Sequence, residues 1–137
     1  MLTLSEDAMT TAGVLLLAIV AVEYGGTHVL RIVRGRLSMT LFQQRFARAG
    51  HAHAGVLVIL ALVCQLFADA ADMGGIQEAL GRNGVAFAAI LMPAGFFLSS
   101  IGQGRTEPNR LIVLVWIGAA VLAAGAISLG IGLLTAA

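Results

Sequence analysis

Two histidines separated by one residue, His51 and His53, begin a long apolar run. Imidazole titrates near neutral pH, ligates heme and transition metals, and can carry a proton. A third histidine, His28, and an acid, Glu23, lie in an earlier apolar segment. Ionisable groups inside membrane segments are costly and are therefore functional candidates. These four side chains are the predicted catalytic residues.

The spacing of His51 and His53 decides what they can bind together. Successive residues of an α-helix are about 100° apart, so these two side chains point about 200° apart. A compact metal site on one helix would need histidines three or four residues apart. We therefore predict that the two imidazoles serve different neighbours. Contact with lipid headgroups is the alternative explanation, above all for His28.

The depth of these groups follows from the arginines. The three histidines lie three to five residues from the nearest arginine, which at about 1.5 Å per residue places them within ~8 Å of it. Glu23 lies deeper, about 12 Å from Arg31. Its short side chain cannot reach the surface, so it is protonated, paired or facing a water cavity. We expect it to meet a histidine of the second helix, and a purely structural pair is the alternative.

The segment VEYGGTHVL adds possible ligand contacts. Gly25 and Gly26 have no side chain, so another backbone or a flat ligand can approach closely there. Tyr24 precedes His28 by four residues and shares its helix face. The predicted cofactor-binding residues are therefore Tyr24, Gly25, Gly26, His51 and His53, and the predicted metal ligands are His28, His51 and His53.

The elements that position these residues follow from the apolar blocks. Of 137 residues, 59% are hydrophobic and 11% charged, and the mean hydropathy is +0.96. The charges delimit four blocks of 20 to 27 residues with at most one acid each, and about 20 helical residues cross a bilayer. We predict an all-α polytopic membrane protein, a single antiparallel bundle of four transmembrane helices over residues 11–33, 47–67, 85–101 and 109–134. Its first helix lacks the basic start of a signal peptide and is expected to be retained.

The distribution of charge predicts the orientation in the membrane. Seven of the eight arginines flank the connections between the first two and the last two spans, whereas Arg82 lies opposite, with Asp69, Asp72 and Glu78. The positive-inside rule then places both termini outside the cytoplasm. A bacterial cytoplasmic membrane is the expected location. The arginines orient the chain and contact lipid headgroups, so no nucleic-acid partner is expected.

The connections and the helix surfaces carry further signals. The segment 34–50 is partly amphipathic and is expected to lie along the cytoplasmic surface. Thr106 is the expected cap of the fourth helix, with Pro108 in its first turn. The run GAAVLAAGAISLGIG is rich in small residues, which favour close helix contact in a membrane.

The His51-Ala52-His53 element near the start of a membrane helix resembles the His-x-His element of the heme–copper oxidase subunit I family. In that family the two imidazoles project to opposite sides of one helix and bind two hemes. The length and four-span layout are similar to small membrane proteins of the hydroxylaminobenzene mutase type. Three histidines are too few for a complete heme–copper centre, so such a site would require a homo-oligomer, a trimer or dimer.

Three functions are therefore considered. The leading hypothesis is a histidine-based heme or transition-metal site near the cytoplasmic face with a redox or related catalytic role. The first alternative is a cofactor-free intramembrane mutase or isomerase acting on a small apolar substrate. The second is a proton- or metal-conducting protein or an accessory subunit of a larger membrane complex. The sequence contains no Walker loop, nucleophile elbow or His-Glu-x-x-His pattern, which disfavours nucleotide enzymes and hydrolases.

Overall fold

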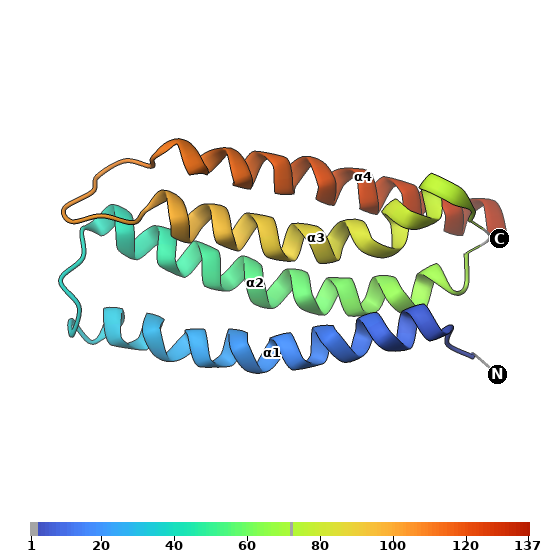
Figure 1. The fold of residues 1–137 in the computed structure, drawn as a ribbon, viewed down its shortest axis with the longest axis horizontal. Coiled ribbons are helices and arrows are strands. Elements are labelled where there is room, and N and C mark those ends of the chain that lie inside the picture. Colours follow the sequence, from blue (N-terminus) through green and yellow to red (C-terminus); the bar gives the residue numbers. More distant parts are fainter. Residues whose placement is uncertain (1–2, 72) are drawn as a thin grey trace.

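The computed structural model describes residues 3–71 and 73–137, and this part of the chain forms four long antiparallel helices without a strand (Figure 1). The helices are α1 (Glu6–Val33), α2 (Leu41–Ala68), α3 (Gly75–Ser99) and α4 (Val113–Ala136), with a short 3₁₀ helix η1 (Arg110–Ile112) before α4. All four are long and apolar enough to cross a membrane. This confirms the predicted all-α membrane bundle. Asp72, one of the acids predicted opposite the arginines, lies outside the described residues.

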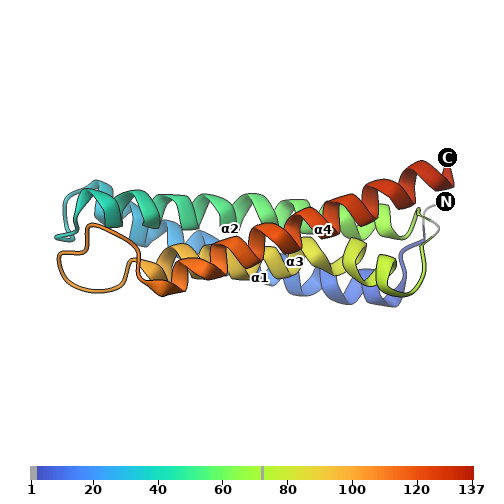
Figure 2. The ribbon, with the colours of Figure 1, turned by 90° about the horizontal axis from the view of Figure 1, so that it is seen from above.

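The two ends of the bundle differ in what they contain. Both chain termini and the α2–α3 connection lie at one end, here called the terminal end (Figure 2). The α1–α2 and α3–α4 connections lie at the other end, here called the arginine end because seven of the eight arginines are in or near these connections.

The helix α2 begins earlier than predicted. Thr40 is its N-cap and forms a capping box with Gln43, whose backbone N–H donates to the Thr40 hydroxyl over 3.2 Å. The Gln43 side chain in turn accepts from the Thr40 backbone N–H, also over 3.2 Å. These bonds satisfy groups that the first turn of a helix leaves unpaired. The prediction of a surface segment over 34–50 is therefore wrong from residue 41 onward, where the chain is already part of α2.

The starts of α3 and α4 also differ from the predictions. The helix α3 begins at Gly75, ten residues before the predicted start, because the charged residues of its first turns have partners and do not require a solvated loop. Before α4, the cap is Asn109 rather than Thr106. The Asn109 side chain accepts from the Leu111 backbone N–H over 2.8 Å, which starts η1.

Glycines let the backbones of α3 and α4 come into contact. Gly118, Gly125 and Gly132 of α4 are buried and spaced seven residues apart, a spacing that keeps them on one face of the helix. A Cβ added at Gly125 would lie 3.0 Å from the Gly84 Cα, so the two backbones are in direct contact there. The small residues thus bring helices together as the sequence predicted.

The arrangement leaves α1 at an edge. The helix α3 packs against both α2 and α4, whereas α1 packs principally on α2 (Figure 1). The apolar core therefore centres on α2 and α3, and Leu15 is the α1 residue that is buried in it. Much of α1 remains exposed on the protomer surface.

Candidate functional site

His51 faces α1, where its ring lies against the two glycines. A Cβ added at Gly26 would lie 3.4 Å from both Cε1 and Nε2 of His51, and one added at Gly25 would lie 3.7 Å from its Nδ1. A Cβ at either position would meet the ring only in ordinary van der Waals contact, and within this protomer the group against the two glycines is the His51 imidazole. The predicted approach of a backbone or a flat ligand to Gly25 and Gly26 stays a prediction. The ring is half-buried between the helices.

His53 faces the opposite side of α2, toward α3. Its ring lies 4.9 Å from the ring of Phe96, centroid to centroid, and its Nδ1 lies 2.8 Å from the backbone carbonyl oxygen of Ala49. A carbonyl oxygen only accepts hydrogen bonds, so Nδ1 carries the proton and the Nε2 of the neutral ring has a free lone pair. His51 and His53 thus contact different helices, as their angular separation predicted.

The α1 candidates do not join the α2 histidines. Glu23, Tyr24 and His28 are exposed on the surface of α1, and Tyr24 is 79% exposed. No hydrogen bond or ion pair among the described residues links Glu23 to a histidine, so the expected contact with the second helix is not made within one protomer. The described residues also contain no group of three or more His, Cys, Asp or Glu side chains that could hold a metal ion.

A polar cluster at the terminal end was not predicted from the sequence. It consists of Ser5, Gln65, Asp69 and Arg82 and is called the Asp69 cluster below. Arg82 donates to Asp69 Oδ1 over 2.7 Å, and the two side chains are only 9% and 5% exposed. The backbone N–H and the hydroxyl of Ser5 donate to the two carboxylate oxygens over 2.7 and 2.8 Å. The cluster therefore ties the start of α1 to the end of α2 and to α3.

These bonds determine the ionisation of Asp69, which follows the last residue of α2. Burial disfavours the charged carboxylate and by itself would raise the pKa. The hydrogen bonds from Ser5 and Arg82, together with the positive charge of Arg82, outweigh burial and hold the pKa of Asp69 below its ordinary value. Asp69 is therefore an ionised partner of Arg82 at neutral pH.

Gln65 supports the cluster from inside the bundle. It is 1% exposed, and its Nε2 donates to the backbone carbonyl of Arg82 over 2.7 Å. No described residue donates to its Oε1, which is buried. The sequence signal for this residue was an amide within an otherwise apolar run, and for Arg82 it was a lone arginine far from the others.

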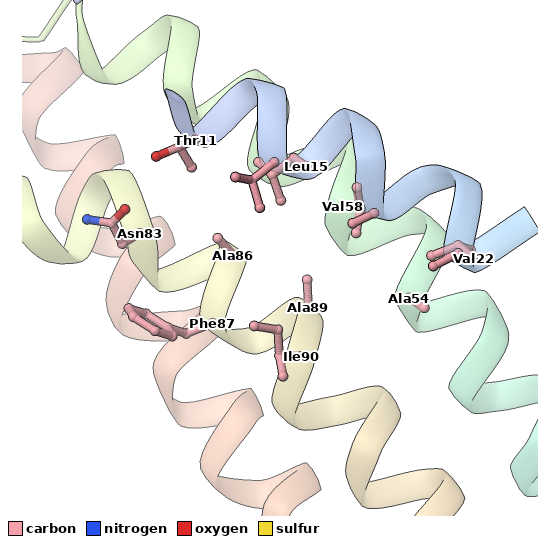
Figure 3. A pocket seen from close by; sticks show the side chains of 13 residues that line it. Thr11, Leu15, Val22, Ala54, Val58, Asn83, Ala86, Phe87, Ala89 and Ile90 are labelled. Carbon is pink, nitrogen blue, oxygen red and sulfur yellow. The ribbon is translucent and has the colours of Figure 1, made fainter. Parts of the chain in front are cut away.

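A cleft of about 350 Å³ separates α1 from α3 (Figure 3). It is lined on α1 from Thr11 to Val22, on α3 from Asn83 to Ile90, and on α2 by Ala54 and Val58. Only Thr11 and Asn83 contribute polar side chains, and Figure 3 places both at the same end of the cleft. This cleft was not predicted from the sequence.

His51 lies on the α2 face that lines this cleft. Ala54 and Val58 follow it by three and seven residues, a spacing that puts all three on one helix face. Because Ala54 is at the end of the cleft nearer the arginine end, His51 is one turn beyond it. The imidazole therefore lies next to the apolar space between α1 and α3.

Comparison of the chain with protein-family models, curated proteins and solved structures finds no match.

Proposed function

We propose that this integral membrane protein carries a heme near its arginine end, bound through Nε2 of His53, and has a redox or related catalytic role. The observation that supports the proposal is the hydrogen bond from His53 Nδ1 to the Ala49 carbonyl over 2.8 Å. Histidines that ligate a metal usually donate their other ring N–H to a carbonyl or carboxylate, which fixes the tautomer. When bound, the heme iron would supply one-electron chemistry.

The residues present fit a heme better than a bare metal ion. A heme requires one or two axial ligands from the protein, and a single oriented imidazole meets that need. A metal ion held by side chains alone usually takes three or four, and no such group exists within the described residues of one protomer. Phe96 adds apolar surface beside His53, and the Phe46 ring lies 5.4 Å from that of Phe96, centroid to centroid.

An absorption spectrum with iron analysis of the detergent-purified protein tests this proposal. Protein produced with an adequate heme supply should have a Soret band and stoichiometric iron, and both should disappear in His53→Ala. Phe96→Leu is the matched control, because it changes the neighbour of the ring and keeps the ligand. A colourless, iron-free wild-type preparation would exclude the heme.

The proposal includes a homo-oligomer, a dimer or trimer. Glu23, Tyr24 and His28 are exposed on α1 although Glu23 belongs to a membrane-crossing helix. A charged group facing lipid is costly, so cover by a neighbouring protomer is favourable. Light scattering of the purified protein should give a mass of two or three chains, and Glu23→Gln should leave the helix content unchanged. A monomeric mass in several mild detergents would contradict the oligomer.

The proposed orientation has both termini outside the cytoplasm of a bacterial cell, with the arginine end inside. The support is the distribution of the arginines, since positive residues are retained on the cytoplasmic side. A reporter enzyme that is active only outside the cytoplasm should be active when fused after Ala137 and inactive when inserted near Gly104. The reverse pattern would invert the orientation.

A specific observation favours a second candidate, a cofactor-free mutase or isomerase. His51 lies one turn beyond the apolar cleft, where a small apolar substrate could arrive from the bilayer and exchange a proton with the imidazole. Heme-free protein should then rearrange a hydroxylaminoarene to its aminophenol isomer, and His51→Ala should lose this activity. Equal turnover by the wild type and His51→Ala would exclude the role of His51.

A further inference from the structure

The gap between α1 and α3 continues beyond the cleft toward the terminal end. A second hollow of about 250 Å³, here called the vestibule, is lined by Asp7 of α1 and by residues of α3 that include Glu78, Arg82 and Asn83. Asn83 lines both the vestibule and the cleft. Asp7 also lies one turn before Thr11, the first α1 residue of the cleft. The vestibule and the cleft are therefore consecutive parts of one gap.

The vestibule carries an excess of negative charge. Asp7 and Glu78 contribute carboxylates, and Arg82 is the basic residue among those lining it. The charge of Arg82 is already matched, because its guanidinium lies 2.7 Å from Asp69, whose side chain is only 5% exposed. Glu78 lies farther away, 3.5 Å from the same guanidinium, and its side chain is 45% exposed. The open side of the vestibule is thus complementary to a cation.

The dimensions of the cleft restrict its occupant. The α1 lining from Thr11 to Val22 corresponds to a length of about 16 Å. The volume of about 350 Å³ is therefore spread along the helix as a narrow, elongated space. The space suits a thin apolar body such as one hydrocarbon chain.

We propose that this gap is a binding site for lipophilic cations, with a single hydrocarbon chain in the cleft and an ammonium group in the vestibule beside Asp7 and Glu78. The apolar lining receives the chain from the bilayer, and the polar side chains of Thr11 and Asn83 mark the change from cleft to vestibule. The chain leaves lipid for a cleft that is equally apolar, so its fit to the cleft walls provides the affinity of the chain. The carboxylates select the sign of the head group. The site does not depend on either proposed role of the histidines, because no histidine lines it.

The test uses the full chain in lipid nanodiscs and a dodecyltrimethylammonium analogue with a photoreactive diazirine in mid-chain. Labelled residues should map to 11–22 of α1 and 83–90 of α3. Unlabelled dodecyltrimethylammonium should compete, and dodecanol, which has the same chain without the charge, should compete about three- to tenfold less well. Even labelling of all lipid-facing helices, or equal competition by the alcohol, would overturn the proposal.

Two variants test the two parts of the site separately. Asp7→Asn combined with Glu78→Gln should weaken competition by the cation about three- to tenfold and leave that by dodecanol unchanged. Ala86→Phe should fill the cleft and abolish the specific labelling. Ala123→Phe, on the exposed surface of α4, is the matched control and should label as the wild type does. Unchanged cation binding in the double charge variant would overturn the proposal even if Ala86→Phe failed to fold.

Discussion

The contact between Gly84 and Gly125 offers the sharpest test of the fold. A Cβ added at Gly125 would lie 3.0 Å from both the Gly84 Cα and the Leu80 carbonyl oxygen, which are backbone atoms that cannot rotate away. On the same helix, a Cβ added at Gly130 would meet no atom within 4 Å. Gly125→Ala and Gly130→Ala therefore add the same methyl group, the first against the backbone of α3 and the second where no atom lies within 4 Å.

The expected cost follows from these distances. Carbon atoms pack at about 3.5–4.0 Å, so the methyl group at Gly125 would push α3 and α4 apart by about 0.5–1 Å. Overpacking of this kind costs about 1–3 kcal/mol of unfolding free energy. Gly130→Ala should change that free energy by less than about 0.5 kcal/mol, as expected for a substitution without new contacts. Because Gly125→Ala already separates the helices, Gly84→Ala should lower the unfolding free energy less in that background than in the wild type.

Unfolding in mixed micelles of a mild detergent and increasing dodecyl sulfate can measure these differences. The fluorescence of Trp116, the single tryptophan, reports the transition. Because helices persist in dodecyl sulfate, the assay isolates helix packing from helix propensity. Equal midpoints for Gly125→Ala and Gly130→Ala would refute the close backbone contact between α3 and α4.

Three further predictions concern polar residues, and those at Asp69 and Gln65 use the same assay. Asp69→Asn should cost about 3 kcal/mol at pH 7, because it leaves Arg82 buried without its charged partner, and Glu78→Gln should cost less than about 1 kcal/mol. Since the pKa of Asp69 is lowered on folding, its stabilisation is present above the unfolded pKa of about 3.9 and is lost as the pH falls through the folded value. Asp69→Asn should therefore remove part of the acid sensitivity of the unfolding free energy below pH ~4. An unchanged acid profile would contradict this assignment. Gln65→Leu should change stability by less than about 1 kcal/mol, because it removes the unpartnered Oε1 together with one hydrogen bond; a large loss would mean that Oε1 has a partner in solution. Thr40→Val should cost about 1 kcal/mol and increase hydrogen exchange in the first turn of α2, because it removes the cap; unchanged exchange there would argue against the capping box.

The candidate site was predictable only in part. The rotation of 100° per residue fixes the relative directions of His51 and His53, and the structure has them contacting α1 and α3. The same rule could not tell whether Glu23 or His28 turns toward α2, and in the protomer both side chains are exposed. The ion pair of Arg82 with Asp69 could not be predicted either, because the two residues are thirteen positions apart and the connection between them was predicted to be a solvated loop.

The sequence by itself determined the number of helices and their antiparallel order, because each apolar block is long enough to cross a bilayer and the connections are short. It also determined the end at which the arginines gather. Only the tertiary structure decided that the glycines of α4 meet Gly84, that α1 packs mainly on α2, and that a cleft separates α1 from α3. The physical reason is that lipid is as apolar as the interior of the bundle, so hydrophobicity does not distinguish a buried helix face from an exposed one. Those choices depend on the fit between side chains of different helices, and a single sequence does not display that fit.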